Sequence, residues 1–101
     1  MTAARDITPA AMLLQARVRV PQEVVFRSFP KETVVLNLET GLYHGINPTG
    51  GRMLETLAKV GSVSEAATAL AAQYEVPPEE LQADLCGFCE ALLERGLLVI
   101  E

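Results

Sequence analysis

One stretch in the middle of the chain constrains the fold more than any other, because it predicts a β-hairpin that runs directly into a helix. Residues 33–38 are mostly β-branched or apolar, residues 39–41 (Glu-Thr-Gly) supply a short loop, and Leu42–Ile46 forms the return strand. Asn47-Pro48 then ends the strand, because the residue before a proline avoids the helical conformation while proline suits the first helical turn. We therefore expect a strand edge to lie beside a helix.

A three-residue loop also predicts the register of this hairpin. It places Leu38 opposite Leu42 and, further from the loop, Leu36 opposite His44 on the same face of the sheet. The first face then carries Leu36, Val34, His44 and Ile46, and the second carries Asn37, Val35, Tyr43 and Gly45. The first face is the more apolar of the two.

The segments on either side of the hairpin predict further strands. Residues 24–29 are rich in β-forming residues, and a Pro-Lys-Glu turn joins them to the hairpin, which indicates a three-stranded antiparallel sheet. Residues 17–20 alternate but are a weaker strand candidate, because Pro21 follows them. Residues 97–100 form either a final strand or a docked tail.

Three helices are expected after the hairpin, over residues 48–60, 62–74 and 78–95. The second begins with a capping box formed by Ser62 and Glu65, and the third begins with proline and acidic residues. Helical spacing predicts two buried stripes, one of Met53, Leu54, Leu57 and Val60 and one of Val63, Ala66, Ala67, Leu70 and Tyr74. The expected fold class is α+β, a three-stranded antiparallel sheet packed on three helices.

The third helix has more apolar surface than packing on one neighbour requires. Its main stripe consists of Leu81, Leu85, Phe88 and Leu92, and Cys86, Cys89 and Leu93 widen that stripe on one side. Two alternatives follow. Either this helix is deeply buried between the sheet and the other helices, or its extra flank lines a groove.

Chain length and composition favour a single small domain. A chain of 101 residues with 50% hydrophobic and 21% charged residues can bury one core but hardly a deep substrate cavity, so a stand-alone enzyme is not expected. We expect residues 17–101 to form the domain and residues 1–16 to be a flexible or weakly structured extension, although Thr8-Pro9 could cap a brief helix over residues 10–16. No signal peptide or membrane span is evident, which predicts a cytosolic protein with no membrane partner.

Charge is distributed unevenly and argues against a nucleic-acid partner. Residues 60–101 carry eight acidic residues and one basic residue, a net charge of −7, whereas residues 1–59 carry five acidic and seven basic residues, a net charge of +2. Binding to nucleic acid relies on lysine and arginine side chains that replace the counterions of phosphate groups. The acidic third helix therefore disfavours DNA recognition through this helix.

The sequence contains no evident catalytic or metal-binding constellation. Cys86 and Cys89 have C-x-x-C spacing, but redox motifs need the first cysteine at a helix amino terminus, and this pair lies in mid-helix. His44 is the single histidine, so a zinc site would lack ligands. We therefore expect no catalytic residue, no metal and no cofactor, with both cysteines acting as core thiols.

Several short segments, taken in order, resemble the PqqD family, named for protein D of pyrroloquinoline quinone synthesis. They are Val-Leu-Asn-Leu-Glu-Thr-Gly-Leu-Tyr-His-Gly-Ile-Asn-Pro-Thr-Gly at residues 35–50, Met-Leu-Glu-Thr-Leu at 53–57, Ala-Ala-Gln-Tyr-Glu-Val at 71–76, Asp84-Leu85, and Leu-Leu-Glu-Arg-Gly-Leu-Leu at 92–98. The resemblance covers roughly residues 24–100. It implies a winged helix-turn-helix-like fold that recognises the leader segment of a ribosomally made precursor peptide.

The resemblance also implies where that peptide binds. In the family the leader adds as a strand to the third strand of the sheet, here Leu42–Ile46, and lies in the cleft beside the third helix. This agrees with an edge strand whose free backbone groups can pair with a peptide. The expected peptide-binding residues are Leu42, His44 and Ile46 through their backbone, Gly45 on the same strand, Tyr43 as an amphipathic wall, Leu81, Leu85, Phe88 and Cys89 as pocket lining, and Asp84 as a polar clamp.

As a small stand-alone member, the chain most resembles the recognition proteins of lasso peptide clusters. That resemblance implies two further partners, a cysteine-protease-like leader peptidase and an asparagine-synthetase-like cyclase. Two hypotheses from other classes remain open. One is a winged-helix transcriptional regulator, and the other is a structural subunit that uses the same strand edge for self-association.

Overall fold

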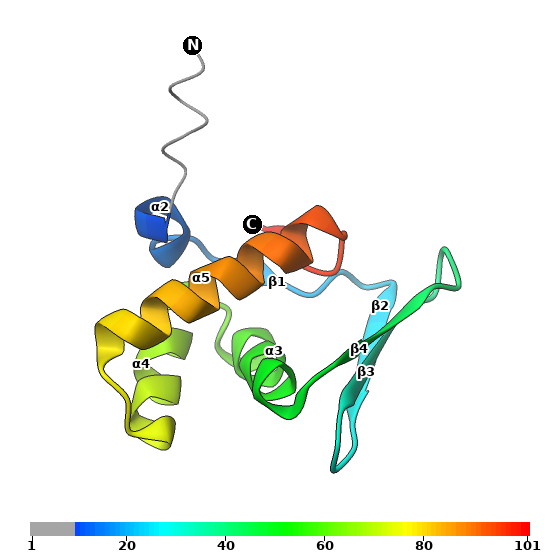
Figure 1. The fold of residues 1–101 in the computed structure, drawn as a ribbon. Coiled ribbons are helices and arrows are strands. Elements are labelled where there is room, and N and C mark those ends of the chain that lie inside the picture. The colour runs from blue at the N-terminus through cyan, green and yellow to red at the C-terminus, as the bar shows by residue number, and fades with distance from the viewer. Residues whose placement is uncertain (1–9) are drawn as a thin grey trace.

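The computed structural model describes residues 10–101 and has the expected α+β architecture (Figure 1). Its elements, in chain order, are α2 (Ala10–Leu14), β1 (Val18–Arg19), β2 (Val24–Ser28), β3 (Thr33–Asn37), β4 (Tyr43–Ile46), α3 (Pro48–Val60), α4 (Val63–Tyr74), α5 (Pro78–Glu94) and β5 (Val99–Ile100). The hairpin that runs directly into a helix and the three helices after it are confirmed. Within the described residues, no helix is both long and apolar enough to cross a membrane.

The strands form two separate sheets. The larger is antiparallel, with the order β2-β3-β4, so that β4 lies at one edge. The smaller pairs β1 with β5, which brings residues from the two ends of the described chain together (Figure 1). The alternating segment at residues 17–20 and the apolar segment at residues 97–100 are therefore each other's partners. Of the two alternatives for the chain end, the strand is the one observed.

The loop of the β3–β4 hairpin differs from expectation by one residue. The Asn37 N–H donates to the Leu42 carbonyl at 2.9 Å, so the loop contains four residues, 38–41, and not three. The Asn37 side-chain oxygen accepts hydrogen bonds from the N–H groups of Glu39 and Thr40 at 2.8 and 3.2 Å, and Gly41 adopts a φ of +78°. This side chain stabilises the longer turn. The predicted register, with Leu38 opposite Leu42, is wrong for this reason.

The shift of one residue changes which side chains of β3 and β4 share a face of the sheet. Val35 pairs with His44, and Thr33 pairs with Ile46. Val35 is fully buried, so the face that carries Val35 and His44 is the inner face, toward the helices. The outer face instead carries Val25, Phe29, Val34, Leu36 and Tyr43, and much of this apolar surface is exposed.

Close approach of α3 to the sheet depends on local sequence at the β4–α3 junction. The Asn47 side chain caps α3 by accepting a hydrogen bond from the Gly50 N–H at 2.8 Å, and Pro48 follows as the first helical residue. At Gly51 there is no room for a Cβ atom, because the Thr33 side chain occupies that position. The glycines therefore let the first turn of α3 lie directly against β3.

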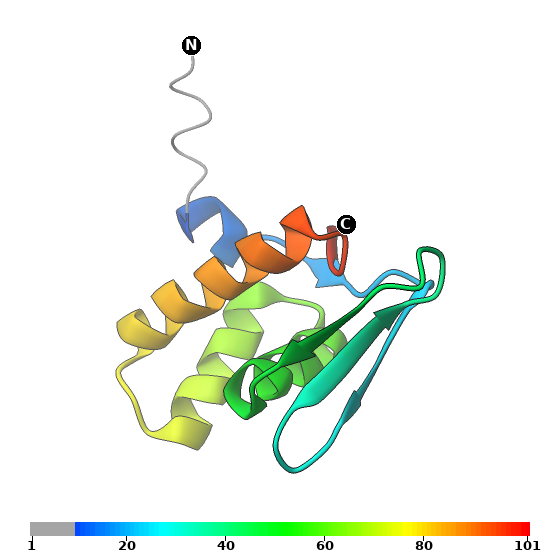
Figure 2. The same cartoon turned by 45° about the vertical axis from the view of Figure 1, so that its right-hand side comes forward.

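The helices enclose the core on the inner side of the sheet (Figure 2). Helix α5 packs against both α4 and α2, and it buries Leu81, Leu85, Cys86, Cys89 and Leu92. Deep burial is thus the correct alternative for the cysteine flank. In α4 the buried stripe ends at Ala71 rather than Tyr74, which is 37% exposed because it lies in the last turn before the chain reverses.

The short helix left open by the sequence for residues 10–16 is observed as α2. Leu13 is 5% exposed and belongs to the core, and α2 contacts α5. The packing of an apolar side chain in that core stabilises a helix too short to persist alone. The expectation of a flexible extension for residues 1–9 lies outside the described residues.

Candidate functional site

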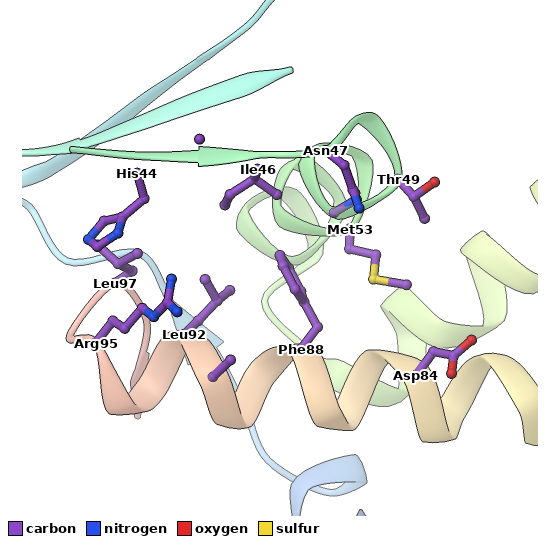
Figure 3. A pocket seen from close by; sticks show the side chains of 13 residues that line it. His44, Ile46, Asn47, Thr49, Met53, Asp84, Phe88, Leu92, Arg95 and Leu97 are labelled. Carbon is purple, nitrogen blue, oxygen red and sulfur yellow. The ribbon is translucent and has the colours of Figure 1, made fainter. Parts of the chain in front are cut away.

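A groove of about 490 Å³ runs between β4 and α5 (Figure 3). Residues from β4, the start of α3, α5 and the segment after α5 contribute to it. The lining consists of His44, Gly45, Ile46, Asn47, Thr49, Gly50, Met53, Asp84, Phe88, Ala91, Leu92, Arg95 and Leu97. The groove therefore lies against the edge strand of the sheet, where the sequence predicted a strand beside a helix.

The side of α5 that faces the groove is a helical stripe that Arg95, the residue after the helix, continues, and Leu92 of the buried stripe borders it. Asp84, Phe88, Ala91 and Arg95 lie four, three and four positions apart, which places them on one helical face next to the buried stripe. Phe88 is half-buried, since it packs at the edge of the core and also forms the wall of the groove. The groove is thus on the opposite flank from Cys86 and Cys89. The helical spacing of Asp84, Phe88 and Arg95 is the feature of the sequence from which this flank could have been predicted.

The floor of the groove is a close contact between β4, α3 and α5. A Cβ atom placed on Gly50 would lie 2.5 Å from Ile46 Cγ2 and 3.2 Å from Phe88 Cε1. Ile46 and Phe88 therefore meet over a glycine, and Figure 3 shows both side chains directed into the space between β4 and α5. At this point the floor is the main chain of Gly50, with the side chains of Ile46 and Phe88 and the Oδ1 atom of Asn47 close to it.

The outer edge of β4 presents backbone groups that no other strand of residues 10–101 pairs with. Antiparallel pairs alternate between hydrogen-bonded and non-bonded positions, and the bond from the Asn37 N–H to the Leu42 carbonyl fixes the phase. Every second residue of the strand from Leu42 onward thus turns its N–H and C=O toward β3. Tyr43 and Gly45 turn theirs toward the open edge. The open edge lies along the rim of the groove.

This phase corrects the sequence-based assignment of backbone roles. The residues predicted to offer their main chain, Leu42, His44 and Ile46, direct it toward β3. The His44 and Ile46 side chains instead point into the groove (Figure 3). The assignment fails because residues of an edge strand alternate, so those whose N–H and C=O groups bond to β3 cannot also offer them at the open edge.

The other predicted site residues divide into those that reach the groove and those that do not. Gly45, Asp84 and Phe88 line it. Leu42 and Tyr43 are 62% and 73% exposed and are not among the lining residues. Leu81, Leu85 and Cys89 are buried in the core and also do not line it. Eight further lining residues were not predicted from the sequence, namely Asn47, Thr49, Gly50, Met53, Ala91, Leu92, Arg95 and Leu97.

The two ends of the groove carry opposite charges. Asp84 lies at the end near Thr49, and Arg95 lies at the end near His44 and Leu97 (Figure 3). Both side chains are exposed, and neither forms an ion pair among the described residues, where the single ion pair joins Arg19 and Glu101. Each charge is therefore available to a bound molecule.

The buried cysteines of α5 are chemically quiet. Burial, with the nearby Cys86 and Glu90, raises the pKa of the Cys89 thiol to about 12, and burial together with Glu90 also raises the pKa of the Cys86 thiol. Both thiols stay protonated at neutral pH, and a protonated thiol is a poor nucleophile and a poor metal ligand. Within residues 10–101 no group of three or more His, Cys, Asp or Glu residues could hold a metal ion.

Comparison with known protein families identifies the class. The model of the family described as coenzyme PQQ synthesis protein D (PqqD) matches residues 32–98, which is more than half of the chain. The chain belongs to the PqqD family. No curated protein matches it.

Two solved structures have the same fold. TbiB1 in complex with the TbiA(beta) leader peptide is 31% identical, with a TM-score of 0.72, and the match covers 79% of this chain and 93% of that chain. Lasso peptide synthetase B1 complexed with its leader peptide is 24% identical, with a TM-score of 0.72, and the match covers 83% of this chain and 99% of that chain. At that identity the second similarity concerns the fold alone.

Proposed function

We propose that this protein binds the leader segment of a ribosomally made precursor peptide in lasso peptide biosynthesis. The leader adds as a fourth strand to the open edge of β4, and its alternate side chains enter the groove beside α5. The observation that carries this proposal is the juxtaposition of the two features, since the unpaired backbone of Tyr43 and Gly45 lies at the rim of an apolar groove. The similarity to TbiB1, which was solved with a leader peptide, supports it.

The two features contribute differently to recognition. Backbone pairing is independent of the peptide's sequence and supplies affinity, whereas side chains that fill the groove supply selectivity. The proposed peptide-binding residues are Tyr43 and Gly45 through the main chain, and His44, Ile46, Asp84, Phe88 and Arg95 through side chains. Leu81, Leu85 and Cys89 act indirectly, because they hold α5 against the core.

The protein acts in this proposal as a non-catalytic carrier. It holds the leader while a separate cysteine-protease-like peptidase and a cyclase act on the precursor, in the cytosol where the precursor is translated. The buried, protonated thiols support a role without catalysis. No specific observation favours a transcriptional regulator or a self-associating subunit, and the acidic residues of α5 disfavour contact with DNA.

A pair of variants at one residue tests the strand addition. Gly45→Pro removes the outward N–H and places the proline ring at the edge, while β4 keeps its bonds to β3, because proline is tolerated on an edge strand when its nitrogen faces outward. Gly45→Ala adds the same Cβ, which meets only the flexible end of Glu32, at 2.7 Å, and keeps the N–H. We expect Gly45→Pro to weaken leader binding by about tenfold or more and Gly45→Ala to leave it nearly unchanged.

The measurement is fluorescence anisotropy with labelled leader peptides of candidate lasso precursors, and thermal unfolding by circular dichroism serves as the folding control. Equal affinities for the two variants, with both folded, would remove β4 from the interface. Absence of binding by the wild-type protein would contradict the proposed function itself.

A further inference from the structure

The two charges of the groove have a fixed order relative to the strand beside them. Figure 3 shows β4 running from His44, near Arg95, toward Asn47, on the side of Asp84. Helix α5 runs the other way, from the part that carries Asp84 to the end that Arg95 caps. A strand that pairs antiparallel with β4 therefore runs parallel to α5, and its amino-terminal part lies near Asp84.

The spacing of the two charges sets a spacing in the peptide. Asp84 lies in α5, and Arg95, the residue that caps the helix, follows eleven positions later on the same helical face. Eleven residues correspond to about 16 Å at 1.5 Å per helical residue. An extended strand covers about 3.4 Å per residue, and only every second side chain faces α5. Two peptide side chains four residues apart span about 14 Å, and flexible side chains can close the remaining distance.

The position between the two charged ends is apolar. Phe88, Ile46 and Leu92 meet the middle of the groove, and Figure 3 places all three between Asp84 and Arg95. The peptide residue midway between the two charged ones faces this region. A polar side chain there would be desolvated without a partner, whereas an apolar one would bury its surface.

We propose that the groove selects an extended segment with the order basic–x–apolar–x–acidic, read from its amino end, in which the basic side chain lies by Asp84 and the acidic side chain by Arg95. This inference rests on the proposed function and adds a direction and a substrate pattern to it. A peptide with the reverse order would place its acidic side chain beside Asp84 and its basic side chain beside Arg95. The resulting repulsion between like charges disfavours that peptide and so contributes to specificity.

A charge-swapped protein tests the pattern. The double variant Asp84→Lys, Arg95→Glu keeps the net charge, and both side chains are exposed and outside the core. Glu90→Lys is the matched control, because Glu90 is an exposed acid of α5 that does not line the groove. A displayed library of random linear peptides is selected against the full-length wild-type protein, the swapped variant and the control.

The expected result is enrichment of basic–x–apolar–x–acidic segments by the wild-type protein and by Glu90→Lys, and of acidic–x–apolar–x–basic segments by the swapped variant. In anisotropy measurements, an enriched peptide and its isomer with the two charged residues exchanged should differ about three- to thirtyfold in affinity for the wild-type protein. This difference should shrink in about 1 M salt, where charges are screened within ~3 Å.

The other outcomes separate the two proposals. Enriched peptides with no charge order, or with an order that the swap leaves unchanged, would overturn this inference and leave leader binding intact. The reverse order on the wild-type protein would overturn the direction proposed here. If no peptide is retained by the folded wild-type protein, the inference and the proposed function both fail.

Discussion

At the scale of single residues, the clearest physical signature is the pair of buried thiols in α5. The mid-helix position of the pair predicts core thiols, and both Cys86 and Cys89 are buried in the structure. Burial disfavours the charged form of each group, and the neighbouring Glu90 adds to this effect. The consequence is an alkaline limit to stability.

Stability should fall as the pH rises above about 9. In the unfolded chain a cysteine ionises near pH 8.5, whereas in the folded protein the pKa of Cys89 is raised to about 12, so ionisation favours unfolding over this interval. We expect the free energy of unfolding to decrease by about 1.4 kcal/mol per pH unit from this thiol, with a further contribution of the same sign from Cys86. Urea unfolding at a series of alkaline pH values measures the slope.

The double variant Cys86→Ala, Cys89→Ala is the control for that slope. It has lower stability at neutral pH because it leaves a cavity, but its dependence on alkaline pH should be shallower than that of the wild-type protein. The same slope in both proteins would show that other groups control alkaline unfolding.

At the scale of elements, the site depends on the junction where β4 passes into α3 beside α5. The sequence predicted this junction from Asn47-Pro48, and the structure confirms it. What the sequence did not indicate is that only glycine at position 50 leaves room for the Ile46 and Phe88 side chains beside the start of α3. In a sequence, a glycine near the start of a helix can serve several structural purposes. Its purpose here becomes evident only once α5, from a distant part of the chain, packs beside it.

Gly50→Ala should therefore damage the groove. Alanine normally favours a helix over glycine by up to ~1 kcal/mol, but here the new methyl group would overlap Ile46 and press on Phe88, and such overpacking costs about 1–3 kcal/mol. We expect a lower melting temperature and leader binding weakened about tenfold or more, measured by circular dichroism and anisotropy.

Gly87→Ala is the matched comparison on α5, because a Cβ atom there meets nothing within 4 Å. It should raise the stability by up to ~1 kcal/mol and leave leader affinity unchanged. If both alanine variants behave alike, steric crowding at Gly50 does not shape the groove.

The hairpin shows how a small local error propagates through an element. The predicted strands and their order are confirmed, but a loop of four residues in place of three changed which residues of β3 share a face with His44 and Ile46 of β4. The Asn37 side chain stabilises this loop, and asparagine is a recognised turn residue, so the signal was present in the sequence. Gly41 is the last loop residue whether the loop has three residues or four. Hydrogen bonds of the loop decide between the two lengths, and the spacing of residues in the sequence does not reveal these bonds.

At the scale of the whole molecule, the sheet has two apolar faces with different roles. The inner face packs against the helices and ends at the groove, whereas the outer face leaves Val25 and Phe29 45% and 51% exposed. The outer face lies on the far side of the sheet from α5. Leader binding in the groove should therefore not depend on it.

We expect the double variant Val25→Ser, Phe29→Ser to bind the leader with wild-type affinity. Phe88→Ser makes a comparable change within the groove and should weaken binding by about tenfold or more, since it removes the wall of the groove and part of the core edge. Anisotropy gives the affinities, and circular dichroism confirms that each variant is folded. A loss of affinity in the outer-face variant would place the leader on the opposite side of the sheet.

The sequence by itself determined the α+β class, the hairpin, the three long helices and the strand beside which the candidate site lies, because these follow from periodicity, caps and turn residues that act over a few neighbours. Tertiary structure alone decided which flank of α5 lines the groove, which backbone groups of β4 remain open, and that Asp84 and Arg95 mark its two ends. These depend on the rotation of α5 and the register of β4 relative to each other, and such relative placements arise from packing between segments that are far apart in the chain.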